Sequence, residues 1–154
     1  KGKLIEGIFA GETINTPSML ANEDYLVALK WAKSIGGLQG LIGRATANAR
    51  VVHDFCAANP WIANLAEDAA TASTTSVCLK FTDPRITDGE AFAKAVAKRI
   101  EKAGAGFDMG AYRDAPPGLR IWCGSTVETV DVQDLMPWIA HAFHAEIAAL
   151  AQAA

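Results

Sequence analysis

The chain has 154 residues, of which 51% are hydrophobic and 20% are charged, so it can bury a core and forms one ordinary domain or part of a larger protein. Its formal net charge of −3 and its lack of a basic run argue against nucleic acid as the main partner. The apolar runs fall short of the ~20 residues that span a bilayer, and the first residues lack the layout of a signal peptide, so no membrane partner is expected.

Two helices are expected in the first half of the chain. Thr16-Pro17 is a helix-start signal, because Thr can cap a helix and Pro suits its first position. Apolar residues follow at helical spacing until Gly36-Gly37 stops the helix. A second helix is expected from Leu38 to about Ala58, and Pro60 ends it.

A smaller unit of strands and helices is expected after a polar connector of small residues. The run Ser76–Phe81 predicts a strand, and the next helix spans about Gly89 to Ala103 with Asp88 as its cap. The runs "FDMGAYR" (107–113) and "GLRIWCG" (118–124) flank a turn, so they are predicted as two short strands.

A last helix is expected to open at Asp131. Pro137 lies inside it, so a kink or a first turn in 3₁₀ form is expected. The order of elements is then two helices followed by strand–helix–strand–strand–helix. The predicted fold class is α/β, with two helices that lead into a small α+β domain.

The pair Asn15-Thr16 stands directly before the proline of the first helix start. At a helix N-terminus the unpaired N–H groups favour an anion such as phosphate, and an Asn amide and a Thr hydroxyl add donors. The alternative is a helix cap and nothing more, which is the commoner use of such residues. The local sequence leaves both interpretations open.

Two arginines border the predicted turn between the short strands. Arg120 lies in the apolar run "GLRIWCG", where its charge must face solvent or meet an anion, because an unpaired buried charge is costly. Arg113 precedes the turn. Together they could grip two acidic groups of one substrate, since a guanidinium offers a carboxylate two parallel hydrogen bonds, or they could be solvated loop charges.

The other reactive residue types form no catalytic or metal-binding set in the sequence. His141 and His144 are three apart on the last helix but lack a convincing third ligand, so they are interpreted as surface or packing residues. His53-Asp54, near the end of the second helix, is interpreted as structural. The three cysteines are widely spaced, which indicates neither a disulfide framework nor a zinc site and fits a reducing compartment such as the cytoplasm.

Nearly the whole chain resembles one known family. The stretches "KLIEGIFAGETINTPSML", "DYLVALKWAKSIGGL" and "GLRIWCGSTVETVDVQDL" are similar to the C-terminal portion of the phosphoserine aminotransferases, fold-type-I enzymes that depend on pyridoxal phosphate. The stretch "INTPSM" is the more specific signal. The resemblance implies amino transfer between glutamate and 3-phosphohydroxypyruvate in serine biosynthesis, by a cytoplasmic homodimer.

The resemblance also implies roles for individual residues. In the family an Asn-Thr pair holds the cofactor phosphate of the neighbouring subunit, and this pair falls on Asn15 and Thr16. The arginine that receives the substrate α-carboxylate falls on Arg120. The family often has a His-Arg pair for the substrate phosphate upstream of that arginine, and here Tyr112-Arg113 stands in its place.

The chain departs from a complete family member at its beginning. The family's cofactor-binding lysine lies upstream, and Lys1 and Lys3 do not match it. The chain has no initiator Met and opens like the middle of a protein, so it is expected to need an N-terminal large domain and to be inactive by itself. Residues 1–16 are expected to end that large domain, 17–73 to form linking helices and 74–154 to form the small domain.

Two other interpretations stay open. The chain could belong to another fold-type-I aminotransferase or lyase that uses pyridoxal phosphate. It could also be a stand-alone α+β module that binds a small molecule, although the mid-protein start and the paired helices before the sheet disfavour this.

Overall fold

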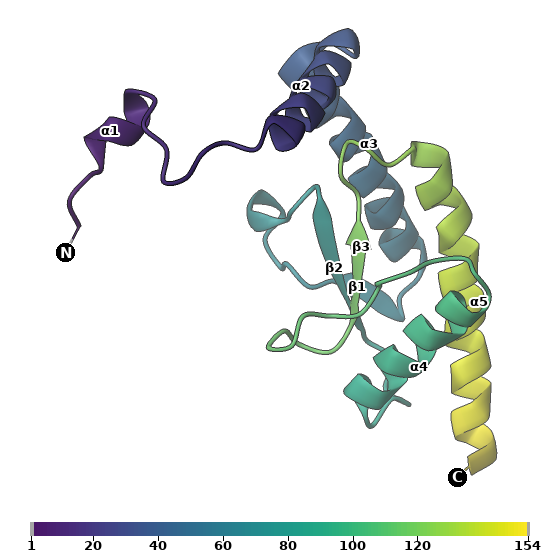
Figure 1. Ribbon diagram of the computed structural model, residues 1–154. Helices are drawn as coiled ribbons and strands as arrows, with labels where there is room; N and C mark the ends of the chain where they lie inside the picture. The colour runs from purple at the N-terminus through teal and green to yellow at the C-terminus, as the bar shows by residue number, and fades with distance from the viewer. Residues whose placement is uncertain (1, 154) are drawn as a thin grey trace. The chain divides into compact units, whose positions relative to one another are not determined.

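The computed structural model describes residues 2–153, apart from the side chain of Ala153 (Figure 1). The described residues form two compact units that divide after Leu41, and each unit is described by itself. The first unit contains α1 (Glu6–Phe9), α2 (Met19–Ser34) and the first residues of α3 (Gly37–Ala58). The rest of α3 and all later elements form the second unit.

Helix α2 begins later than the sequence predicted. Its cap is Ser18, whose hydroxyl accepts a hydrogen bond from the Ala21 N–H at 3.3 Å. The prediction that Thr16 caps this helix is therefore wrong. Pro17 lies before the cap instead of at the first helical position, and the extended backbone of Ser18 places its own hydroxyl over the first turn.

The turn between α2 and α3 requires glycine. Gly36 and Gly37 both have positive φ, 99° and 64°, where side-chain-bearing residues are strained. The predicted stop of the first helix at this pair is confirmed, and the second helix follows at once and ends at Ala58, as predicted.

The second unit contains a three-stranded antiparallel sheet in the order β1-β2-β3. The strands are β1 (Ile62–Asn64), β2 (Ser76–Phe81) and β3 (Leu119–Trp122), and β2 has the predicted bounds. Strand β1 was not predicted, because three residues are too few to show alternation. A short 3₁₀ turn, η1 (Ala69–Thr71), interrupts the connector between β1 and β2.

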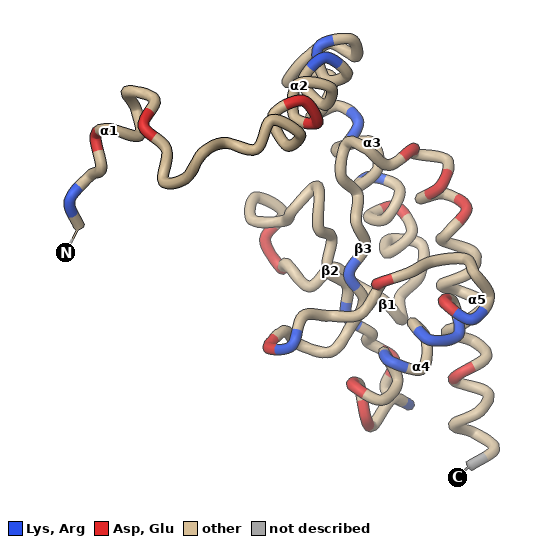
Figure 2. Tube along the Cα trace, in the orientation of Figure 1, with Lys and Arg blue, Asp and Glu red and all other residues tan. Residues whose placement is uncertain are grey.

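Two further helices complete the second unit, α4 (Gly89–Lys102) and α5 (Thr129–Ala153). The predicted cap of α4 is confirmed, because the Asp88 side chain accepts a hydrogen bond from the Ala91 N–H at 2.9 Å. Figure 2 shows that α4 carries charges of both signs.

One face of the sheet packs against helices α3, α4 and α5. The buried residues of β2 and β3 alternate along each strand, so the side chains between them point to the opposite face. Phe143 of α5 lies at the centre of this core and stacks on Trp61, with ring centroids 3.9 Å apart. The core residues are Ala49, Val52, Ile62, Val77, Leu79, Phe92, Val96, Ile100, Met109, Leu119, Ile121, Cys123, Val132, Met136, Ile139, Ala142, Phe143 and Ile147.

The structure corrects two further predictions. The run 107–113 is not a strand, and only Gly110 forms an isolated bridge, with Leu119. Asp108 has a φ of 52°, which breaks the extended backbone that a strand needs. Helix α5 begins at Thr129, before the predicted Asp131, and its first turn is α-helical, so the 3₁₀ form that was predicted for it is wrong, while the alternative kink at Pro137 stays a prediction.

Pro137 is tolerated inside α5 because it lies on the exposed side of the helix. Its ring removes one N–H, which leaves the carbonyl of Gln133 without its usual partner. Gln133 is exposed as well, so water can satisfy that carbonyl.

The two compact units of this chain do not test the predicted domain boundaries, which concern a longer protein. The sheet unit begins within α3, because Asn48, Ala49 and Val52 of that helix are buried in it, and β1 pairs with β2. The predicted division into 1–16, 17–73 and 74–154 stays a prediction about a longer protein.

Candidate functional site

Asn15 and Thr16 lie in the exposed segment between α1 and α2. Among the described residues neither side chain has a hydrogen-bond partner. Because Ser18 is the cap of α2, the amide of Asn15 and the hydroxyl of Thr16 are both available to a ligand. Donors of these types fit a phosphate group.

Arg120 projects from the face of the sheet that the helices leave open. It lies opposite Cys78 in the register of β2 and β3, while its neighbours Leu119 and Ile121 are buried toward the helices. Its side chain is nevertheless only 15% exposed, because residues of the 106–112 segment cover it.

The guanidinium of Arg120 has four contacts with that segment. Its Nη2 lies 2.8 Å from Asp108 Oδ2 and 3.4 Å from the Asp108 carbonyl oxygen. Its Nη1 donates to the Tyr112 hydroxyl at 3.1 Å, and its Nε donates to the Gly110 carbonyl at 3.5 Å. The Tyr112 ring also lies against the guanidinium carbon, 4.4 Å from ring centroid to Cζ.

A cavity of about 430 Å³ opens beside Arg120. Asp108, Trp122 and Asp131 are among its lining residues. The site therefore combines one cation with two carboxylates at the border of a cavity large enough for a small amino acid.

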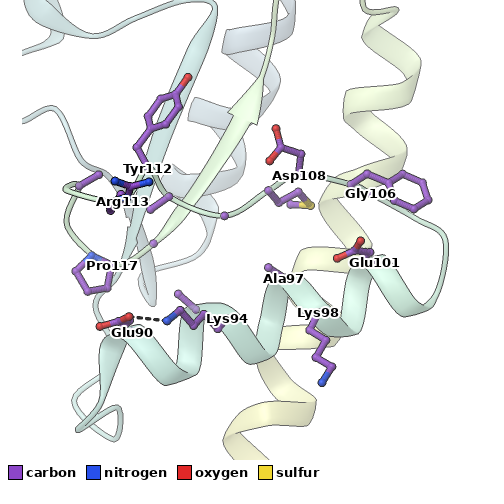
Figure 3. A pocket seen from close by; sticks show the side chains of 17 residues that line it. Glu90, Lys94, Ala97, Lys98, Glu101, Gly106, Asp108, Tyr112, Arg113 and Pro117 are labelled. Carbon is purple, nitrogen blue, oxygen red and sulfur yellow. Dashed lines mark hydrogen bonds and ion pairs between the residues drawn. The ribbon is translucent and has the colours of Figure 1, made fainter.

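Arg113 lines a second and larger cavity, of about 1,050 Å³, between α4 and the 106–118 segment (Figure 3). Tyr112 lines it too, and Lys94 at its edge is paired with Glu90 at 2.6 Å. The two cavities share residues 106–109. Arg113 does not line the smaller cavity beside Arg120, and Arg120 does not line the larger cavity beside Arg113. The structure therefore brings the predicted arginine pair near one segment without placing both in one cavity.

His144 and His53 each contact a neighbouring side chain of the second unit. His144 lies with its ring edge toward Phe143 at 5.2 Å, and His53 Nε2 lies 3.1 Å from the Asn64 amide nitrogen. Within residues 2–153, no group of three His, Cys, Asp or Glu side chains could hold a metal ion.

The cysteines of the second unit include two poor nucleophiles. Burial raises the pKa of the Cys56 and Cys123 thiols to about 11, so little thiolate forms at neutral pH.

No helix in the described part of the chain is both long and apolar enough to cross a membrane.

Sequence reasoning missed two residues that shape the site. Asp108, the partner of Arg120, lies twelve positions before it in a run that was predicted to be a strand. Asn48 of α3 is fully buried and donates to the carbonyls of Cys123, Gly124 and Val127, which follow β3. The presence of a polar Asn within a row of alanines was a signal for such a buried anchor.

The fold is shared with solved proteins. Over 86% of this chain and 34% of the other, the structure superposes on phosphoserine aminotransferase from Bacillus circulans subsp. alkalophilus with a TM-score of 0.73 and 20% identity. A second solved phosphoserine aminotransferase, studied for radiation damage of its Schiff base, covers 75% of this chain with a TM-score of 0.63 and 14% identity. The fold of this chain is therefore shared with part of these solved phosphoserine aminotransferases, and its mixed helices and small sheet agree with the predicted α/β class.

Sequence comparison finds relatives of this chain with higher identity. The chain is 51% identical over 145 residues to phosphoserine aminotransferase from Methanosarcina barkeri and 50% identical over 142 residues to that from Methanosarcina mazei. The corresponding protein of Corynebacterium glutamicum is 27% identical over 137 residues. No family model matches the chain. The predicted resemblance is confirmed: this chain is homologous to one portion of the phosphoserine aminotransferases.

The chain spans only part of these relatives. It covers 37% of the length of each Methanosarcina protein, although 93% and 92% of the chain itself is aligned.

Proposed function

We propose that this chain is the C-terminal portion of a phosphoserine aminotransferase, which transfers an amino group between glutamate and 3-phosphohydroxypyruvate in serine biosynthesis. The observation that carries the proposal is the identity of 51% over 145 residues with the Methanosarcina barkeri protein. The largely buried Arg120 beside a cavity gives the second unit a group suited to an amino-acid carboxylate.

The proposed cofactor is pyridoxal phosphate, which supplies an electron sink for amino transfer when it is bound. Within this chain, Asn15 and Thr16 would hold its phosphate, because their donors are exposed and unpartnered among the described residues. We place this contact across the interface of a homodimer, on the cofactor of the neighbouring subunit. The lysine that binds the cofactor belongs to the upstream large domain, so this chain by itself is inactive.

The proposed substrate contacts lie in the second unit. Arg120 binds the α-carboxylate that glutamate and phosphoserine share, and Arg113 binds the phosphate or the distal carboxylate. Each arginine lines its own cavity beside the 106–118 segment, so the two can act on separate anionic groups. Neither is a proton-transfer group, since an arginine stays charged at neutral pH.

The exposed apolar residues of the first unit support the proposal that other parts of the enzyme cover it. It exposes many large apolar side chains within a short segment, and such exposed apolar patches mark interaction sites in soluble proteins. We propose that the N-terminal large domain and the second subunit cover them, in a cytoplasmic enzyme. The exposed side chains are Leu4, Ile5, Ile8, Phe9, Ile14, Met19, Leu20, Tyr25, Leu26, Val27, Leu29, Trp31 and Leu38.

A chimera tests the proposed function. This chain would replace the matching segment of Methanosarcina barkeri phosphoserine aminotransferase, which is 51% identical to it. The chimera is expected to bind pyridoxal phosphate and to transfer the amino group of phosphoserine to 2-oxoglutarate. The chain without the large domain is expected to give no cofactor adduct after borohydride reduction.

The outcomes separate the proposal from its alternatives. A cofactor-loaded chimera that uses other amino acids but rejects phosphoserine would indicate a different fold-type-I transferase. A stoichiometric borohydride-trapped adduct on the chain by itself would show that the essential lysine is not missing.

A further inference from the structure

The contacts of Arg120 leave no complete edge of its guanidinium for a ligand. A guanidinium can grip a carboxylate along its Nε–Nη2 edge or its Nη1–Nη2 edge, and Nη2 belongs to both. In this structure Nη2 already faces two oxygens of Asp108, at 2.8 and 3.4 Å. The Asp108 carboxylate therefore competes directly with a second carboxylate for Nη2 of Arg120.

The two partners of this ion pair are held unequally. The Arg120 side chain is 15% exposed and is fixed by the Tyr112 ring and hydroxyl, whereas the Asp108 side chain is 88% exposed. The Asp108 carboxylate can rotate into water at little cost, because a solvated carboxylate needs no protein partner. Arg120 can then keep its position and its contact with Tyr112.

The backbone at Asp108 suits this arrangement. Its φ of 52° lies in the left-handed region, which Asp and Asn adopt more readily than most residues. Asp108 and Arg120 also line the same cavity of about 430 Å³, so a ligand that enters it meets both groups. Asp131 is the other carboxylate in that lining, and it has no ion-pair partner among the described residues.

We propose that Asp108 is an internal competitor for the substrate carboxylate at Arg120 and so sets the affinity of the site. It neutralises Arg120 in the ligand-free protein and is displaced when a carboxylate binds. The inference rests on the proposed function, because that function places the substrate carboxylate on Arg120. Asp108 is thus a residue that sets carboxylate affinity by acting through Arg120.

The test measures equilibrium binding of glutarate, an unreactive dicarboxylate, to the full-length holoenzyme. Asp108→Asn keeps a residue that tolerates positive φ and removes the competing charge. It is expected to tighten glutarate binding about 2- to 5-fold, the range that corresponds to one exposed ion pair. Asp108→Gly, which also accepts this backbone, is expected to tighten binding by a similar factor.

A matched control separates direct competition from a general change of charge. Asp114→Asn removes the same charge from an exposed position in the same segment. Measured at about 0.5 M salt, where charges more than ~5 Å apart are largely screened, this control is expected to leave glutarate affinity unchanged. The KM for glutamate should fall in Asp108→Asn while kcat does not rise.

The possible results distinguish this inference from the function on which it rests. If Arg120→Lys weakens glutarate binding and Asp108→Asn leaves it unchanged or weakens it, Asp108 is not a competitor and the inference is wrong. If Arg120→Lys leaves glutarate binding unchanged, the carboxylate does not bind at Arg120, and both the inference and that part of the proposed function fail. An equal gain in Asp114→Asn would also overturn the competitor role.

Discussion

Thr16 and Ser18 lie two residues apart and have separable roles at the start of α2. Ser18 caps the helix, so Ser18→Ala is expected to lower the stability of the full-length protein by about 0.5–2 kcal/mol and to leave cofactor affinity unchanged. Thr16→Ala is expected to do the opposite, weakening pyridoxal phosphate binding by about 1.5–3 kcal/mol without a loss of the cap. Cofactor titration and thermal unfolding of both variants check this. If Thr16→Ala binds the cofactor as tightly as the unchanged protein does, the proposed phosphate contact is wrong.

The two arginines are expected to differ in the substrates they affect. Arg120→Lys keeps the charge but loses the planar fork, so it should slow single-turnover transamination of phosphoserine, glutamate and alanine alike. Arg113→Ala should slow phosphoserine and glutamate more than alanine, which has no distal anion. If Arg113→Ala affects all three equally, or none, Arg113 is a solvated loop charge.

Asp83 gives a residue-scale prediction about acid stability. Two hydrogen bonds from the Arg85 guanidinium and one from its backbone N–H lower the pKa of the Asp83 carboxyl from 3.8 to about 2. Because the folded-state pKa is depressed, the stabilisation is present above pH 4 and is lost as the pH falls toward 2. Asp83→Asn should therefore reduce the loss of unfolding free energy between pH 5 and pH 2.5, measured by denaturant titration; an unchanged pH slope would show that this pair does not contribute.

At the scale of elements, α3 anchors the loop that joins β3 to α5. Asn48 Nδ2 donates to the Val127 carbonyl at 3.0 Å, and its Oδ1 accepts from the Thr129 hydroxyl at 2.6 Å. Asn48→Ala leaves these buried groups unpaired and is expected to lower stability by about 1–3 kcal/mol. Thr46→Ala, at an exposed position of the same helix, should change it by less than about 0.5 kcal/mol, and similar losses in both variants would contradict the anchor role.

For the whole molecule, the core cluster of the described residues runs from Ala49 to Ile147 and lies within the second unit. A shortened chain of residues 36–154, which retains all of α3, is expected to unfold cooperatively with a midpoint close to that of the longer chain. It should also bind less of a hydrophobic dye, because the exposed apolar residues of α1 and α2 are gone. A non-cooperative transition in circular dichroism would show that the second unit depends on the first.

Local signals in the sequence were enough for several elements of this protein. Strand Ser76–Phe81 and the helix capped by Asp88 were predicted, because alternation and caps depend on residues close together in the chain. Arg120 was also recognised as a charge that must face solvent or meet an anion, since it lies within an apolar run. The family followed from motifs such as "INTPSM", which are properties of the sequence itself.

Other features depend on contacts between residues far apart, so only the tertiary structure decided them. Strand β1 exists because β2 supplies its hydrogen-bond partners, and the run 107–113 stays irregular because Asp108 adopts a positive φ and pairs with Arg120. The backbone conformation at Ser18, which only the structure gives, makes Ser18 and not Thr16 the cap of α2. The sequence by itself determined the resemblance to the phosphoserine aminotransferases, the strong local elements and the presence of an arginine within an apolar run. The folded chain decided which carboxylate that arginine faces, because the partner is set by geometry and not by spacing along the chain.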